Sequence, residues 1–225
     1  MKKRLLIIPA RKNSKRIKNK NFKFFFGKPI IEYSIELAIR SKIFTKIHVS
    51  SDSIKYKKRL SKFKNIEIDL KRPKKLSNDS VGLMDVFSYI VNQYKDRQFF
   101  FDEVWFLSSC SPLITKKDLI NASKLFIKNK ANILLSTCRY SQPIERSFYQ
   151  KNKSLIPINR KMLKKNTQNF KETFYHTGNF SIFDKEIFYK KNVKRKYTGF
   201  HLPISRSVDI DNTEDWKLAE KLFNQ

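Results

Sequence analysis

The sequence has few cysteines, no recognisable repeat and no long apolar run. A membrane span needs about 18–20 consecutive apolar residues, and the apolar stretch over residues 5–8 is also too short for the core of a signal peptide. Two cysteines in 225 residues cannot form a disulfide framework. These absences predict a protein of the reducing cytoplasm that does not enter the membrane.

Acidic residues are also scarce, because 20 Asp and Glu stand against 49 Lys and Arg, for a net charge of +29. Such a balance is typical of proteins that bind nucleic acid or anionic membranes. The lysines, however, are scattered along the chain and do not gather in one tail. We therefore expect a solvated surface without a nucleic-acid partner, whose field still attracts an anionic substrate. A basic, non-catalytic nucleic-acid-binding protein is the alternative of another class, and its affinity would fall steeply with salt.

Short apolar runs alternate with segments of helical periodicity, which predicts one α/β domain with a mainly parallel, Rossmann-like sheet covered by crossover helices. Strands are expected at residues 4–8, 46–50, 65–69, 103–107, 132–137 and 178–183. Helices are expected at residues 29–39, 52–63, 83–94, 115–128 and 212–223. Asp52 or Ser53 is expected to cap the second helix, and Thr115 with Asp118 the fourth. The pattern blurs between 138 and 173, which predicts an insertion at about 139–173.

A cationic loop without glycine follows the first predicted strand. Its sequence, PARKNSKRIKNKN over residues 9–21, gathers cations, amides and a hydroxyl in a small volume. Such groups suit a polyphosphate, although the loop is neither a Walker A motif nor a GxGxxG fingerprint. Because ligands of open α/β sheets sit at the carboxyl ends of the strands, the loop predicts an anion site there.

Two carboxylates flank Ile210 in the segment VDID, residues 208–211. Side chains at i and i+2 of an extended segment project to the same side. Asp209 and Asp211 could therefore hold Mg²⁺, which takes oxygen ligands and shares them with phosphates. The alternative for Asp211 is to cap the next helix, to whose start we assign Glu214 and Asp215.

Five motifs in chain order resemble the cytidylyltransferases that make CMP-activated nonulosonic acids. They are the cationic loop with GKP at 27–29, VSSD at 49–52, RPKKLSND at 72–79, LSSCSPL at 107–113 and VDID followed by Glu214 and Asp215. The family commonly has glycine where this chain has Asn13, and asparagine tolerates a left-handed backbone well. The resemblance implies a three-layer nucleotidyltransferase fold. It also implies a reaction of CTP with a nonulosonic acid that gives the CMP-sugar and pyrophosphate, with Mg²⁺ as cofactor.

The resemblance assigns roles by motif position. It implies catalytic roles for Arg11, Lys20, Asp209 and Asp211, the last two as metal ligands. It implies nucleotide contacts for Arg11, Ser14, Lys15, Lys20, Asn21, Arg72, Asp79 and Ser80. Lys12, Arg16 and Lys18 are expected at the surface.

A further group of segments resembles the pseudaminic acid branch of this family. They are PIERSF at 143–148, TQN at 167–169 and FYHTG at 174–178. This resemblance implies that the sugar is bound by Arg146, Gln168, Tyr175 and His176. It also implies a homodimer that exchanges the insertion at about 139–173.

Two alternatives stay within the family. The same chemistry could act on N-acetylneuraminic, legionaminic or Kdo-type acids. The segment TGN at 177–179 departs from the Asp-Ala-Gly of the pseudaminic acid branch, so a catalytically silent member is the other alternative.

Overall fold

The computed structural model describes all residues except 1, 13, 15, 69–71, 79–80 and 225. Its centre is a six-stranded sheet in the order β10-β6-β9-β5-β1-β4. The strands are β1 (Arg4–Pro9), β4 (Lys46–Ser50), β5 (Glu103–Leu107), β6 (Ile133–Arg139), β9 (Phe174–Asp184) and β10 (Tyr197–His201). Strand β9 runs antiparallel to β5 and β6, and the other pairings are parallel. The predicted mainly parallel sheet is confirmed.

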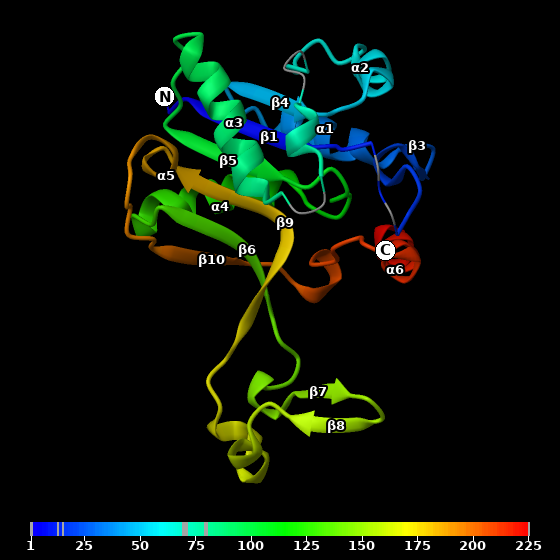
Figure 1. Cartoon of the computed structure of the whole chain (residues 1–225), viewed down its shortest axis with the longest axis vertical. Coiled ribbons are helices and arrows are strands. Elements are labelled where there is room, and N and C mark those ends of the chain that lie inside the picture. The colour runs from blue at the N-terminus through cyan, green and yellow to red at the C-terminus, as the bar shows by residue number, and fades with distance from the viewer. Residues whose placement is uncertain (1, 13, 15, 69–71, 79–80, 225) are drawn as a thin grey trace.

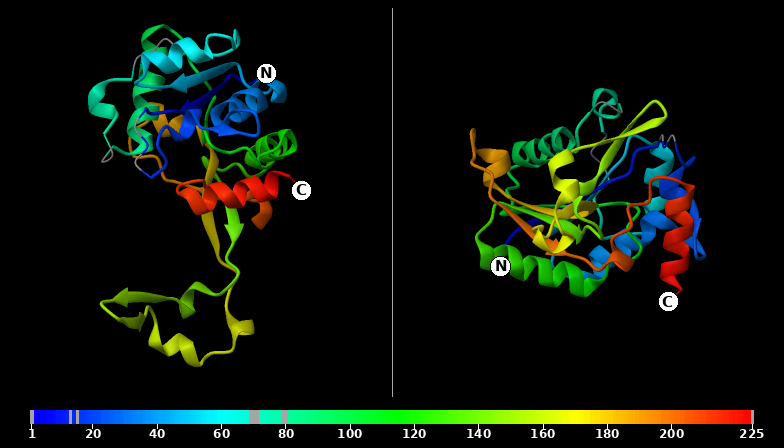
Figure 2. Two further views of the ribbon diagram at one scale, coloured as in Figure 1. Left: turned by 90° about the vertical axis from the view of Figure 1, so that its right-hand side faces the viewer. Right: turned by 90° about the horizontal axis from the view of Figure 1, so that it is seen from below.

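Helices cover both faces of this sheet (Figures 1 and 2). Strand β1 shows the reason. Leu6 and Ile8 join the core under α1 (Ile30–Ser41) and α4 (Lys116–Asn129), whereas Leu5 and Ile7 join the core under α3 (Leu83–Asp96). A buried strand must be apolar on both sides when helices cover both. The helices are α1 (Ile30–Ser41), α2 (Ile54–Leu60), α3 (Leu83–Asp96), α4 (Lys116–Asn129), α5 (Glu186–Tyr189) and α6 (Thr213–Phe223).

Three local expectations differ from the structure. Of the strand expected at 65–69, the described residues 65–68 form one bridge, between His48 and Glu67, and residue 69 lies outside the described residues. Helix α2 begins after Ser53 without a side-chain cap, because Asp52 accepts a hydrogen bond from the backbone N–H of Lys12 instead. Strand β10, which includes a glycine and half-exposed positions, was not predicted. The capping box at the start of α4 is confirmed.

An arm leaves the core between β6 and β9 and projects from one end of the molecule (Figure 1). It contains a hairpin of β7 (Phe148–Lys151) and β8 (Ser154–Pro157) and the 3-10 turns η3 (Ile144–Arg146), η4 (Arg160–Lys164) and η5 (Thr167–Asn169). This is the region where the sequence predicts an insertion. Its apolar side chains are largely exposed, among them Phe148, Tyr149, Leu155 and Ile158.

Shorter elements connect the core to the loops that carry the predicted motifs. They are η1 (Lys20–Phe22), β2 (Phe24–Phe25), β3 (Lys28–Pro29), η2 (Lys74–Leu76) and η6 (Ile204–Arg206). Within the part of the chain that the structure describes, no helix has the length and apolar character needed to cross a bilayer.

Candidate active site

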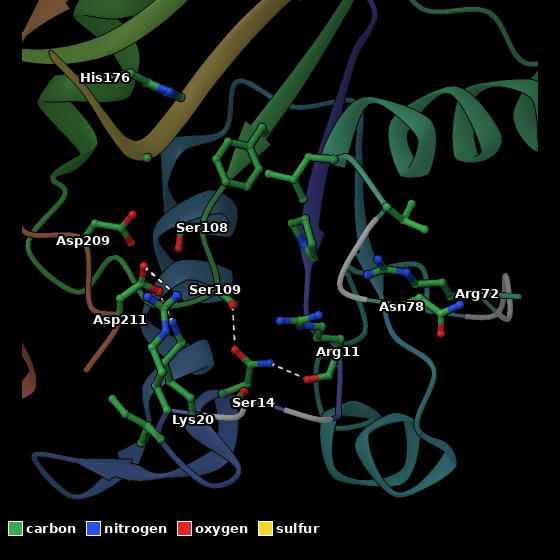
Figure 3. Close-up of a pocket in the computed structure, with 18 residues that line it drawn as sticks. Arg11, Ser14, Lys20, Arg72, Asn78, Ser108, Ser109, His176, Asp209 and Asp211 are labelled. Atoms are coloured by element: carbon green, nitrogen blue, oxygen red, sulfur yellow. Dashed lines mark hydrogen bonds and ion pairs between the residues drawn. The ribbon is translucent and has the colours of Figure 1, made fainter. Parts of the chain in front are cut away.

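A cavity of about 500 Å³ lies at the carboxyl ends of β1 and β5 (Figure 3). The loop after β1, the loop after β5, the segment before α3, strand β9 and the segment 209–211 supply its walls. Its volume lies within the range of small-molecule sites. The fold thus brings four of the five predicted motif regions to one place, at the edge where open α/β sheets bind ligands.

Asn21 fastens the cationic loop to the core. Its side chain is 4% exposed, and its Nδ2 donates to the Arg11 carbonyl at 2.9 Å. Its Oδ1 accepts from the Ser109 hydroxyl at 2.7 Å and from the Cys110 thiol at 3.5 Å. Asn21 lines the cavity, but its amide already holds the cationic loop against the loop that follows β5. Contact between Asn21 and the nucleotide stays a prediction.

Cys110 lies behind this network and does not line the cavity. Burial raises the pKa of its thiol to about 11, although nearby Lys20 lowers it. A thiol in that state is protonated at neutral pH and is a poor nucleophile. The chemistry of the site therefore does not run through this cysteine.

Arg11 and Arg72 form a cationic wall on one side of the cavity (Figure 3). Arg72 is 6% exposed, and its Nε donates to the Leu76 carbonyl at 2.8 Å. Burial lowers the pKa of Arg72, Asp52 raises it and the charge of Arg11 lowers it further. The two guanidinium groups repel each other electrostatically. An anion with several oxygens would relieve this repulsion and accept hydrogen bonds from both groups.

Lys20, Asp209 and Asp211 lie on the opposite side (Figure 3). Lys20 Nζ lies 3.2 Å from Asp211 Oδ1 and also donates to the Ile210 carbonyl. Arg16 was expected at the surface, and its side chain is 66% exposed, yet it lines the cavity with its Nη2 at 2.9 Å from Asp211 Oδ2. Arg16 is therefore at the surface, as expected, and it also borders the cavity beside Asp211.

The start of α6 explains why Asp211 is available to the cavity. Asn212 is the N-cap, and its side chain accepts from the N–H groups of Glu214 and Asp215. Asp215 in turn accepts from the N–H groups of Asp211 and Asn212. The helix is therefore capped by Asn212 and Asp215, and the alternative that Asp211 caps it is wrong.

The acidic pair suits a divalent cation. Burial within the site raises the pKa of Asp209, and the Asp211 carboxylate raises it further. A bound cation would relieve this repulsion. No cluster of three or more His, Cys, Asp or Glu side chains occurs among the described residues. Mg²⁺ fits a site of one or two carboxylates when phosphates and water complete its ligands.

His176 and Gly178 reach the cavity from β9. Burial lowers the pKa of His176, and its Nε2 lies 3.3 Å from the Ser181 hydroxyl. The imidazole is therefore neutral at physiological pH and can accept or donate a hydrogen bond. His176 is one of the residues that the sequence predicts to contact the sugar, and it lines the cavity.

The remaining predicted sugar-binding residues lie away from the cavity in the single chain. The hydroxyl of Tyr175 is 3.3 Å from that of Ser207, and its ring packs on Tyr140. Arg146 and Gln168 belong to the arm, where Arg146 Nη2 donates to the Leu163 carbonyl at 3.2 Å. A sugar-binding role for these three residues stays a prediction.

Some of the residues predicted to contact the nucleotide line the cavity, and others lie outside the described residues. Ser14 lines the cavity, and its contact with the nucleotide stays a prediction. Lys15, Asp79 and Ser80 lie outside the described residues. Asn78 and Ser108 also line the cavity but were not among the expected contacts. Both belong to quoted motifs, RPKKLSND and LSSCSPL, so the signal for them was present in the sequence.

Comparisons with known proteins agree with this geometry. The family model described as Cytidylyltransferase matches residues 5–225. A pseudaminic acid cytidylyltransferase of Campylobacter jejuni is 31% identical over 232 residues, which cover 98% of this chain and 96% of the relative. A CMP-N,N'-diacetyllegionaminic acid synthase of Legionella pneumophila is 25% identical over 97% of this chain and 95% of the relative.

Solved structures support the fold. A CMP:2-keto-3-deoxy-manno-octonic acid synthetase complexed with CTP has a TM-score of 0.70 at 14% identity, with 99% of each chain covered. A 4-diphosphocytidyl-2C-methyl-D-erythritol synthase has a TM-score of 0.69 at 8% identity. The expected nucleotidyltransferase fold is confirmed.

Proposed function

Because the chain belongs to the cytidylyltransferase family, we propose that it joins CTP to a nonulosonic acid and releases pyrophosphate, with pseudaminic acid as the sugar. One observation carries this proposal: Arg11 and Arg72 face Lys20 and the pair Asp209 and Asp211 across a single cavity. Cations opposite a carboxylate pair suit a metal-bearing polyphosphate better than nucleic acid, because bare carboxylates repel phosphate.

The reaction requires positioning and charge neutralisation more than covalent chemistry by the protein. The anomeric hydroxyl of the sugar attacks the α-phosphorus of CTP in line and loses its proton to water as the new P–O bond forms, while the bond to the pyrophosphate breaks. Arg11 binds two phosphate oxygens through its planar guanidinium, whereas Lys20 supplies a point charge. The contacts of Lys20 with Asp211 and the Ile210 carbonyl hold its ammonium group at the cavity before the nucleotide arrives.

We propose Mg²⁺ as the cofactor, held by Asp209 and Asp211. When bound, it neutralises phosphate charge that grows as pyrophosphate departs. Arg16 and Lys20 lie against Asp211 in the structure, so these cations are also placed to meet phosphate oxygens beside the acidic pair.

The choice of pseudaminic acid rests on the relatives. The 31% identity to the Campylobacter jejuni enzyme extends over nearly the full length of both chains, which exceeds the 25% identity to the legionaminic acid enzyme. Neutral His176 lines the same cavity as the acidic pair, where it can hydrogen-bond a sugar hydroxyl or acetamido group. We therefore expect the sugar to bind on the β9 side of the cavity.

Pyrophosphate release with each of the four NTPs, crossed with pseudaminic, legionaminic, N-acetylneuraminic and Kdo-type acids, tests this function. We expect turnover with CTP and pseudaminic acid, and at least a tenfold lower kcat/KM with the other acids, which differ in the hydrogen bonds they can make. Turnover that requires a different acid would change the substrate and keep the chemistry. Absence of pyrophosphate release with every pair would contradict the function.

We also propose that the protein is a cytoplasmic homodimer. Its substrate CTP is a cytoplasmic nucleotide, and both cysteines are free and buried. The arm exposes large apolar side chains that a monomer would leave in water. An exchanged arm from a second copy would cover these side chains and bring Arg146 and Gln168 to the partner's cavity, as their predicted contact with the sugar carboxylate and hydroxyls requires.

Substitutions in the arm test the dimer. Leu155 is 68% exposed and Ile158 is 64% exposed. Leu155→Asp combined with Ile158→Asp is expected to convert a dimer into a monomer in light scattering, because burying two carboxylates at an apolar interface is unfavourable. Ile54→Asp is the matched control, because Ile54 is 73% exposed on α2, away from the arm. A wild-type protein that is monomeric at all concentrations would contradict the proposal.

A further inference from the structure

Strand β9 is irregular where it passes the cavity. Thr137 of β6 pairs with His176 and Leu135 pairs with Ser181, so on the β6 side residues 177–180 stand opposite Ser136 alone. Extra residues of this kind form a β-bulge, which bends a strand and changes the direction of its side chains. The bulge is bounded by His176 on one side and includes Gly178, and both of these residues line the cavity.

A buried pair of hydroxyls fixes the bulge. Ser136 is 0% exposed and Thr177 is 2% exposed. The Ser136 hydroxyl oxygen accepts from the Thr177 hydroxyl at 2.8 Å and from the Phe180 N–H at 3.1 Å. Within the bulge, the carbonyl of Asn179 accepts from the N–H of Ser108 at 2.8 Å and ties β9 to the loop after β5. Satisfied buried polar groups of this kind specify one local geometry.

Gly178 brings the bulge against the acidic pair. Its φ is +68°, and an added Cβ would lie 2.6 Å from Asp209 Oδ2. A glycine is needed here both for the backbone conformation and for the space that the Asp209 carboxylate occupies. The contact atom is the far end of a short side chain, so a methyl group at Gly178 would displace the carboxylate before it displaced the backbone.

We propose that the bulge at residues 177–180 is a positioning device for Asp209, an inference that rests on the proposed function. Ser136 and Thr177 set the shape of the bulge, and Gly178 forms the wall against which the carboxylate rests. None of the three needs to touch the substrates for this role. The TGN segment at 177–179 departs from the sequence of the pseudaminic acid branch, but in this role it is a working part of the site. Its departure therefore does not indicate a catalytically silent protein.

Gly178→Ala, with Gly27→Ala as its matched control, tests the proposal. Gly27 also has a positive φ, +86°, but a Cβ there meets no atom within 4 Å. Both variants therefore strain the backbone, and Gly178→Ala alone displaces Asp209. Calorimetry of CTP binding with and without Mg²⁺ is expected to show that Gly178→Ala lowers the Mg²⁺-dependent gain in affinity by about 10–100-fold. Binding without Mg²⁺ stays at the wild-type level, and Gly27→Ala retains the full gain.

Thr177→Val and Thr177→Ser keep the test decisive if Gly178→Ala fails to fold. Valine removes the hydroxyl that Ser136 binds, and serine keeps it. We expect a reduced Mg²⁺-dependent gain with valine and recovery with serine. Three results would overturn the inference and leave the proposed function intact. They are a folded Gly178→Ala protein with the wild-type Mg²⁺-dependent gain in CTP affinity, an equal loss of that gain in Gly27→Ala, and a full gain with Thr177→Val. A wild type that binds no CTP at any Mg²⁺ concentration would overturn the proposed function as well.

Discussion

Replacement of Asp209 by asparagine is expected to lower Mg²⁺-dependent pyrophosphate release by at least about 100-fold. The amide keeps the size of the side chain but removes the charge that a cation needs from the acidic pair. Steady-state release measured across a range of Mg²⁺ concentrations checks this result. Glu214→Gln is the control, because Glu214 is an exposed carboxylate at the start of α6 and its loss should leave the rate unchanged.

The free energy of unfolding, measured across pH, distinguishes a loss of catalysis in Asp209→Asn from misfolding. The folded protein raises the pKa of Asp209, so folding disfavours the charged carboxylate. The free energy of unfolding of the wild type therefore falls as pH rises from the ordinary carboxyl pKa through the raised value. Asparagine carries no charge, and Asp209→Asn is expected to be at least as stable as the wild type at pH 7, with the difference vanishing in acid. Unchanged turnover in a folded variant would remove Asp209 from the site.

Replacement of Arg11 by alanine is expected to weaken CTP binding by about 10–100-fold, the loss of charge-assisted hydrogen bonds to phosphate. Calorimetry of CTP binding checks this result. Lys12→Ala is the matched control, because it removes the same charge from the adjacent, exposed position of the same loop. Arg11→Lys restores the charge without the planar guanidinium and should recover only part of the affinity.

Equal losses in Arg11→Ala and Lys12→Ala would show that the loop acts only through its overall field. CTP binding that is unaffected in Arg11→Ala would exclude the loop as the triphosphate site. Binding by each variant at two salt concentrations separates the field from the direct contacts, because salt screens exposed charges at a distance more than it weakens bonded pairs.

The sequence predicted those features that depend on short stretches of chain. The continuous apolar run of β1 marks a strand that is buried on both faces, and the cationic loop follows it directly. The i and i+2 spacing of Asp209 and Asp211 correctly predicted that both face one space, although the segment is an extended loop and no strand. The motif positions of Arg72 and Ser14 also led to the cavity.

Features that depend on distant contacts were not predicted. The bulge of β9 needs the hydrogen bond between Ser136 and Thr177, which are 41 residues apart. Arg16 faces the cavity because Asp211, far along the chain, attracts it. Among the described residues, the arm contributes none to the buried cores, so its apolar residues show neither a helical nor a strand period, and the hairpin of β7 and β8 was not predicted.

A crystal structure of the protein with CTP and Mg²⁺ tests the central claim most directly. We expect the triphosphate between Arg11 and Lys20, and a cation bound to Asp209, Asp211 and phosphate oxygens. A nucleotide bound in a different cavity, one lined by Lys130 and Arg195, or a triphosphate without contact to the cationic loop, would contradict the account.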